Sequence, residues 1–187
     1  MSNEFKHASV GSELSQAEWE AVGTHAADGQ TEGDHLRYKS GYWVREPFDI
    51  GARVYNSANQ IIGNASWTNL TFDSERYDTD TIHSTSSNTD RLTAARAGKY
   101  IIIAQVKFAA STVGMRGIRF LLNGATGISY LTRDANATAV DRLNLSTIYN
   151  LAAGDYVTVG VYQSSGGNLD VIAAGNETNE FMMQRIG

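Results

Sequence analysis

Residues 98–108 read GKYIIIAQVKF and residues 156–162 read YVTVGVY, and these two stretches decide the fold. Apolar residues occupy every second position in both, which is the period of a β-strand with one buried face. The residues expected to face inward are Tyr100, Ile102, Ala104, Val106 and Phe108 in the first stretch, and Val157, Val159 and Val161 in the second. The pattern predicts two strands that face a shared hydrophobic core.

The remainder of residues 51–187 continues with short strands and turns. Asn123-Gly124 separates apolar stretches at 116–122 and 126–132, and an Asn-Gly pair is the strongest short-range hairpin signal. Further strands are expected around Val54 and Ile61, and at 67–72, 143–151, 169–173 and 180–186. The whole chain has 18 glycines and one proline, and 51–187 shows no helical periodicity. We therefore predict an all-β sandwich or jelly roll of about ten strands for this part.

The first 50 residues differ from the rest in charge. They carry four Lys or Arg and nine Asp or Glu, a net charge of −5, whereas residues 51–187 are neutral. We therefore predict two parts, 1–50 and 51–187. Within the first part, Ser15 to Glu18 fit a capping box that begins a short helix of about 16–27, and the aromatic-rich stretch 35–45 is typical of a β-hairpin.

Neither of these small elements can bury its own aromatic side chains, because an isolated hairpin is only marginally stable in water. We expect the aromatic residues to attach the chain to a partner instead. The predicted attachment residues are Trp19, Tyr38, Tyr42 and Trp43.

Composition excludes several classes of protein. The chain has no cysteine, which removes disulfides, thiolate nucleophiles and cysteine-bound zinc. A net charge of −5 argues against nucleic acid as the main partner. No apolar run reaches the roughly 18–20 residues of a membrane-spanning helix, and the first residues show no signal-peptide pattern, so we expect no membrane insertion.

No catalytic residue and no cofactor-binding residue is predicted. The four histidines lack the spacing of metal ligands: His7, His25, His35 and His83. A P-loop, a G-x-S-x-G elbow and a G-x-G-x-x-G fingerprint are also absent from the sequence. We expect no enzymatic activity. The arginines at 116, 119, 133 and 142 are expected to be scattered over the surface rather than to form a basic patch.

One acidic run is a candidate calcium site. Its carboxylates belong to Asp73, Glu75, Asp78 and Asp80, and calcium takes six to eight oxygen ligands. The run lacks the glycine and the terminal glutamate of an EF-hand loop. We favour the alternative of a solvated loop held by ion pairs with Arg76 or Arg91, and predict no metal.

Several motifs, in this order, resemble a known superfamily. They are FDSERYD at 72–78 with RLTAARAGKY at 91–100, then LAAGDYVTV at 151–159, and FMMQRIG at 181–187. Together they resemble one domain of the complement C1q / tumour necrosis factor (TNF) superfamily, which implies a C1q/TNF-like jelly roll over 51–187. In character the sequence more closely resembles the C1q-like modules at the ends of bacteriophage virion proteins. LSQAEWE at 14–20 and GDHLRYKSGYW at 33–43 also resemble N-terminal segments of phage tail and fibre proteins.

The resemblance implies a function without catalysis. We expect a virion structural protein, made in the host cytoplasm, whose N-terminal segment docks on a capsid or tail. Its jelly roll would bind a host-surface glycan or protein, or decorate the particle. The alternative is a cellular C1q/TNF-like secreted ligand or adhesion module, but the lack of a signal peptide, of cysteine and of a collagen-like stem weighs against it.

The resemblance also implies a homotrimer, with strands 98–108 and 156–162 in one sheet that faces the threefold axis. A period of two places several apolar or small residues on the outward faces of these strands. The predicted trimer interface consists of Ile101, Ile103, Tyr156, Gly160 and Tyr162. The alternative is that the N-terminal hairpin covers these residues in a monomer.

Overall fold

The computed structural model describes residues 34–39, 42–47, 49–136, 140–177 and 179–187. The chain divides into two compact units, Met1–Phe48 and Asp49–Gly187. In the first unit, β1 (Asp34–Lys39) pairs with β2 (Tyr42–Pro47) as an antiparallel hairpin, with Tyr38 opposite Trp43. The predicted hairpin at 35–45 is therefore confirmed. The predicted helix at 16–27 lies outside the described residues.

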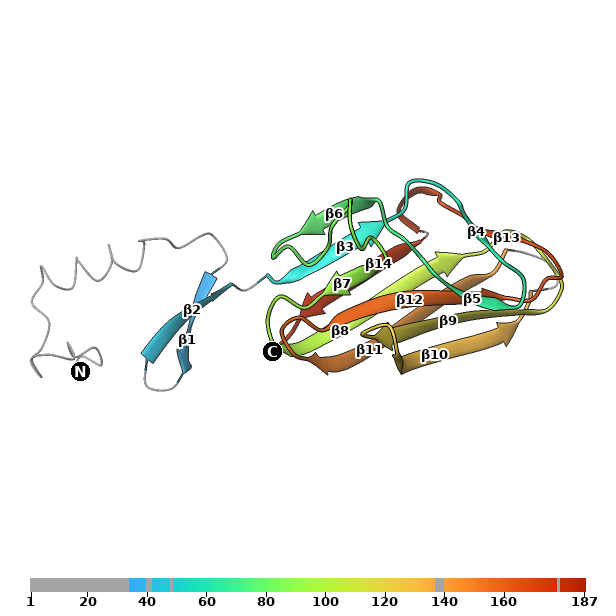
Figure 1. The fold of residues 1–187 in the computed structure, drawn as a ribbon. Helices are drawn as coiled ribbons and strands as arrows, with labels where there is room; N and C mark the ends of the chain where they lie inside the picture. Colours follow the sequence, from blue (N-terminus) through green and yellow to red (C-terminus); the bar gives the residue numbers. More distant parts are fainter. Residues whose placement is uncertain (1–33, 40–41, 48, 137–139, 178) are drawn as a thin grey trace, which may run out of the picture. The chain divides into compact units, whose positions relative to one another are not determined.

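The second unit is a sandwich of two five-stranded antiparallel sheets (Figure 1). The first, which we name the β8 sheet, has the order β11-β8-β14-β3-β6. Its strands are β11 (Arg142–Leu151), β8 (Gly98–Lys107), β14 (Glu180–Arg185), β3 (Gly51–Tyr55) and β6 (Ser74–Asp78).

The second sheet, which we name the β12 sheet, has the order β10-β9-β12-β5, with β7 also paired to β12. Its strands are β10 (Thr126–Asp134), β9 (Met115–Leu122), β12 (Tyr156–Gln163), β5 (Ser66–Asn69) and β7 (Arg91–Thr93). A separate pair joins β4 (Gln60–Ile62) to β13 (Leu169–Val171).

The predicted all-β jelly roll is confirmed, with twelve strands in the described part of this unit, β3 to β14, where about ten were expected. The two additional strands are β6, with five residues, and β7, with three. The residues of β6, SERYD, show no alternation of apolar and polar side chains, and β7 has too few residues for a pattern to identify it. A single 3-10 turn, Gly175–Glu177, interrupts the described strands and loops.

The core lies between the two sheets and is built by the predicted alternation. Tyr100, Ile102, Ala104 and Val106 of β8 are buried, and so are Val157, Val159 and Val161 of β12. The inward faces predicted for both strands are therefore confirmed. Phe181 of β14 lies against Phe120 of β9 and against Phe72, with ring centroids 6.0 and 5.6 Å apart respectively, so aromatic contacts join the two sheets.

The Asn123-Gly124 pair forms the predicted turn between β9 and β10. Both residues have positive φ angles, 51° and 70°, and the amide of Ala125 donates to the carbonyl of Leu122 at 3.1 Å. These are the features of a type I′ turn, whose twist matches that of the flanking strands. Glycine suits the second position because it has no Cβ to clash at positive φ.

A second turn, at 152–155, is tied to the first by side-chain hydrogen bonds. The Asp155 carboxylate accepts from the Nδ2 of Asn123 at 2.9 Å and from the amide of Ala152 at 2.8 Å. In return, the amide of Tyr156 donates to the Oδ1 of Asn123 at 2.9 Å. The bond from Asn123, followed by that from Ala152, lowers the pKa of Asp155 because both donors favour the ionised carboxylate.

Arg116 corrects the expectation of surface arginines, because its side chain is fully buried. Its Nη1 donates to the carbonyls of Val113 and Met115 at 3.0 and 2.9 Å, and its Nε lies 3.6 Å from the buried carboxylate of Asp141. Burial lowers the pKa of Arg116. The charge is tolerated because a carboxylate and carbonyl groups surround it, and the sequence alone does not show that such partners would assemble.

We predict that Asp155→Ala lowers the free energy of unfolding by about 1 kcal/mol at pH 7, because two hydrogen bonds to a charged group are lost. The pKa of Asp155 is lower in the folded protein than in the unfolded chain, so the unfolded chain binds the proton more readily. The stabilisation by Asp155 is therefore fully present above the pKa of the unfolded chain, and it is lost as the pH falls through the pKa of the folded protein. Urea denaturation at pH 7 and at about pH 3 measures it.

Asp134→Ala, which removes an exposed carboxylate at the end of β10, is the matched control. It should change stability little at either pH. If Asp155→Ala lowered the free energy of unfolding equally at both pH values, the stabilisation would not come from the ionised carboxylate of Asp155.

Candidate functional site

The five predicted interface residues do not share one face. Strand β8 belongs to one sheet and β12 to the other, as Figure 1 shows. Ile101 and Ile103 therefore lie on the open face of the β8 sheet, whereas Tyr156, Gly160 and Tyr162 lie on the open face of the β12 sheet. The prediction of a single interface was wrong. Alternation fixes which side of a strand a residue occupies, but it does not fix the sheet to which the strand belongs.

Ile101 and Ile103 are part of an apolar area on the open face of the β8 sheet. The strand register places Ile148 of β11 opposite Ile101, and Met182 of β14 opposite Ile103. Tyr77 of β6 lies opposite Arg53, which is itself opposite Met182. We name Ile101, Ile103, Ile148, Met182 and Tyr77 the β8 patch. Ile148 is 59% exposed and Tyr77 is 40% exposed, which leaves apolar surface open to solvent.

One residue in the sequence pointed to this patch but was not considered when each strand was analysed by itself. Leu143 and Leu145 of β11 face inward, so Ile148 occupies an outward position among polar residues. A single outward isoleucine is common on protein surfaces, but Ile148 adjoins the outward Ile101 and Ile103, and a contiguous apolar area indicates an interaction surface.

A buried carboxylate lies beside the β8 patch. The side chain of Glu180 is fully buried and pairs with both Arg53 and Arg76, whose Nη2 lies 3.2 Å from Oε1. The guanidinium of Arg76 also stacks over the ring of Tyr55, 3.9 Å from its centroid. Two arginines on one buried glutamate satisfy its charge, as a buried ion requires.

The open face of the β12 sheet carries a cluster of aromatic rings. The ring of Trp67 on β5 lies 5.5 Å from that of Tyr162 and 5.7 Å from that of Tyr130, between centroids. The guanidinium of Arg119 on β9 lies 4.3 Å from the centroid of Trp67. We name Trp67, Tyr130, Tyr162 and Arg119 the aromatic platform.

Two glycines let the platform lie close to the sheet. A Cβ on Gly117 would stand 2.9 Å from the Cη2 of Trp67, and a Cβ on Gly160 would stand 3.0 Å from the Nε of Arg119. The backbone at Gly117 and Gly160 therefore admits the indole and the guanidinium where a side chain would displace them. Gly160 was predicted to lie at a trimer axis, but in the structure its missing side chain leaves room for Arg119.

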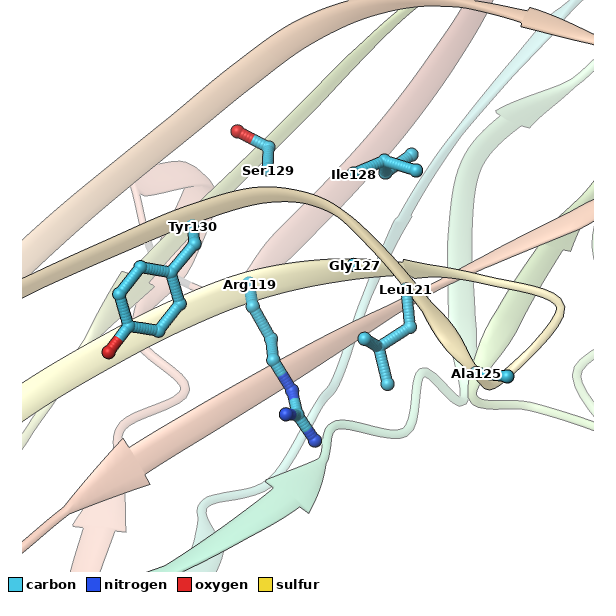
Figure 2. Close-up of a pocket in the computed structure, with 7 residues that line it drawn as sticks. All are labelled: Arg119, Leu121, Ala125, Gly127, Ile128, Ser129 and Tyr130. Carbon is cyan, nitrogen blue, oxygen red and sulfur yellow. The ribbon is translucent and has the colours of Figure 1, made fainter.

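Two hollows adjoin the platform and share Tyr130. The larger, about 420 Å³, is lined by Arg119, Leu121, Ile128 and Tyr130, together with Ala125, Gly127 and Ser129. Figure 2 shows that Arg119, Leu121 and Tyr130 extend to one side of the β9–β10 hairpin, whereas Ile128 and Ser129 point to the other. The smaller hollow, about 190 Å³, is lined by Trp67, Met115, Tyr130, Thr132 and Tyr162.

Tyr156 lies at a different hollow, of about 380 Å³, that also includes Arg91 and His83. Arg91 stacks over the Tyr156 ring at 4.1 Å. Both ring nitrogens of His83 are engaged, Nδ1 with the Oε1 of Glu75 at 2.9 Å and Nε2 with the carbonyl of Thr89 at 3.4 Å. Both ring nitrogens of His83 are therefore bonded within the protein itself.

Two of the four calcium candidates have separate protein partners. The Asp73 carboxylate accepts from the amide of Ser57 at 2.9 Å and from its hydroxyl at 2.6 Å. Glu75 is paired with His83. Desolvation opposes ionisation of Asp73, but the bonds from Ser57 outweigh it and lower its pKa.

The other two are also engaged. Asp78 accepts from the amides of Asp80, Ile82 and His83 at 2.9–3.2 Å, and Asp80 pairs with Arg96 at 3.1 Å. The loop ion pair involves Arg96, and not the Arg76 or Arg91 that the sequence suggested. Among the described residues, no group of three or more His, Cys, Asp or Glu is placed to hold a metal ion.

We predict that millimolar calcium leaves the melting temperature unchanged within about 1 °C, because calcium would have to displace hydrogen bonds that the four carboxylates already make. Magnesium at the same ionic strength is the control, and thermal unfolding followed by circular dichroism is the measurement. A calcium-specific rise of more than about 5 °C that a chelator reverses would contradict this and reveal a site.

The predicted attachment residues are described only in part. Trp19 lies outside the described residues, and Tyr38, Tyr42 and Trp43 lie on β1 and β2. Within the portion of the chain that is described, no helix has the length and hydropathy to cross a membrane.

Comparison with known proteins identifies the fold. No protein-family model matches the sequence, and no curated protein matches it. Among solved structures, murine APRIL at pH 5.0 aligns with a TM-score of 0.56 and 14% identity, covering 74% of this chain and 99% of that chain. Eiger TNF from S. frugiperda aligns with a TM-score of 0.53 and 13% identity, covering 74% and 93%. The chain therefore has the TNF-like jelly-roll fold that the motifs indicated.

Proposed function

We propose that this chain is a non-enzymatic, homotrimeric recognition module that associates through the β8 patch and is attached to a virion by its N-terminal segment. The observation that carries the proposal is the β8 patch itself. It places Ile101, Ile103, Ile148 and Met182 on the open face of a sheet whose other face already packs into the core. A second copy of the chain is the partner that is always present to cover such a face.

The fold supports three copies rather than two. The resemblance to the C1q/TNF superfamily implies a trimer around one sheet, expected to contain both strand 98–108 and strand 156–162. Because these strands lie in different sheets, we choose the β8 sheet, whose open face carries the apolar β8 patch. The buried Glu180 pairs with Arg76 and with Arg53, which lies between Met182 and Tyr77 of the patch. These charges already have partners, as charges must if a second copy is to cover them.

The absence of a competing chemistry also supports a binding role. The described hollows offer no nucleophile with a free base beside it, and His83 is engaged at both nitrogens. The aromatic platform remains on the opposite face of the sandwich, where a trimer built through the β8 patch would leave it open to solvent.

The virion setting rests on the N-terminal resemblance to phage tail and fibre proteins. The alternative, a cellular ligand or adhesion module, uses the same trimer and differs only in what the N-terminal segment contacts. Co-purification with particles separates the two.

We predict a solution mass about three times the chain mass of 20.3 kDa, measured by light scattering after size exclusion. Ile103→Lys combined with Ile148→Lys should reduce the mass to that of one chain, because charge would be buried without partners at the centre of the interface. A native mass near that of one chain would contradict the proposal.

Tyr130→Lys is the matched control, since Tyr130 is 63% exposed on the opposite sheet. It should leave the mass unchanged. Dissociation by Tyr130→Lys, but not by the isoleucine pair, would place the interface on the β12 sheet instead.

We predict that deleting residues 1–46 leaves the jelly roll folded and trimeric but unable to join particles. The cut leaves residues 49–187 intact, and they contain the whole described core. Thermal unfolding and mass report the fold, and sedimentation with particles reports attachment. Loss of folding on deletion would show that the first unit is part of the core, and retained attachment would show that it is not the anchor.

A further inference from the structure

We propose that the aromatic platform binds a saccharide that carries a carboxylate, with Arg119 holding the carboxylate and the rings of Tyr130 and Trp67 contacting the sugar. The inference deepens the proposed function by naming what the module recognises. It does not depend on how many copies of the chain assemble.

Arg119 differs from the arginines that have carboxylate partners. Six described arginines lie within ion-pair distance of a carboxylate: Arg53, Arg76, Arg91, Arg96, Arg116 and Arg133. No ion pair or hydrogen bond joins Arg119 to any described residue, and its buried Nε has no hydrogen-bond partner. The cation lies instead over the face of Trp67, at 4.3 Å, in space that stays open because Gly160 has no Cβ.

This arrangement fixes the guanidinium while leaving its charge uncompensated. Arginine is the side chain best suited to a planar carboxylate, because its fork of donors binds both oxygens at once. Holding it by stacking before a ligand arrives reduces the entropy lost on binding. The charge of the site is therefore complementary to a carboxylate ligand.

The surroundings of Arg119 favour a ring-shaped ligand with apolar faces. Tyr130 is 63% exposed and lies between the two hollows, and the Trp67 ring lies 5.7 Å from it. The faces of aromatic rings carry negative charge density, which attracts the weakly positive C–H groups on the face of a sugar ring. Leu121, which extends to the same side of the hairpin as Arg119 and Tyr130, supplies further apolar lining to the larger hollow.

The size of the larger hollow fits one sugar unit. Its volume of about 420 Å³ lies near the lower end of the range for small-molecule sites, and Arg119 stands in its wall (Figure 2). The hollow exists partly because Gly127, opposite Leu121 in the strand pairing, has no side chain to fill it. A Cβ added at Gly127 would meet nothing within 4 Å.

An acidic peptide could also pair with Arg119, but the observations favour the sugar. A peptide carboxylate would satisfy the guanidinium while making no particular use of the aromatic rings that flank it. A carboxylated sugar brings its charge and a ring with apolar C–H faces in one compact unit. The peptide is therefore an outcome of the test.

The test is titration of the full-length protein with methyl β-glucuronide and with the methyl glycoside of N-acetylneuraminic acid, followed by NMR and calorimetry. Methyl β-glucoside is the uncharged control, and a capped peptide with two glutamates is the competing probe. We expect at least one carboxylated glycoside to bind with a Kd of about 1 mM or tighter, and the glucoside to bind at least about tenfold more weakly.

Two variants locate the binding. Arg119→Gln should weaken carboxylated glycosides at least about tenfold and should largely abolish the preference over the glucoside. Gly127→Val should block binding while leaving Arg119 in place, because its Cβ would meet no other atom within 4 Å and the added methyl groups would take up space in the hollow that Gly127 lines. Arg96→Gln, which removes a surface arginine paired with Asp80, is the matched control and should leave affinity unchanged.

The proposal is overturned if both glycosides fail to bind at about 20 mM, if the glucoside binds equally well, or if neither Arg119→Gln nor Gly127→Val weakens binding. Binding of the glutamate peptide through Arg119 without binding of either glycoside would overturn it in favour of a peptide partner. The mass of each variant is measured in parallel. An intact trimer without saccharide binding would refute this inference alone, whereas saccharide binding by a single-chain species would refute the trimer alone.

Discussion

The structure depends on the packing of Phe181 of β14 against Phe120 of β9 and against Phe72, because these contacts join the two sheets at the middle of the core. All three side chains are fully buried or nearly so. Each strand of the sandwich must turn one side toward this contact, and the period of two then commits the other side to the surface. The composition of the two open faces follows from that constraint.

Much of the fold could be predicted from single strands, but the site could not. Tyr100 to Val106 and Val157 to Val161 alternate so strictly that their inward faces were evident in the sequence, and Asn123-Gly124 identified its turn. The assignment of β8 and β12 to one sheet failed, because strand partners are chosen by contacts between distant residues and leave no local pattern. The aromatic platform was missed for the same reason, since Trp67, Arg119, Tyr130 and Tyr162 come from four strands.

The two open faces differ in what they offer a partner. The β8 patch is mainly aliphatic, with one tyrosine, and the charges on Arg53, Arg76 and Glu180 near it are already paired, which suits association with a surface of the same kind. The β12 sheet exposes aromatic rings beside Arg119, whose charge has no partner among the described residues, which suits a polar ligand with its own charge. A sandwich of this kind can therefore use one face for assembly and keep the other for recognition.

The measurement that tests this division most directly is hydroxyl-radical footprinting of the full-length protein, with the label on Tyr77 and Tyr130 quantified by mass spectrometry. Both side chains are open to solvent in a single chain, at 40% and 63%. Our account predicts that Tyr77 is protected in the native assembly and becomes reactive when the β8 patch carries lysines, while Tyr130 is reactive in both. Equal labelling of Tyr77 in the native protein and in the lysine variant, or protection of Tyr130 in the native assembly, would contradict it.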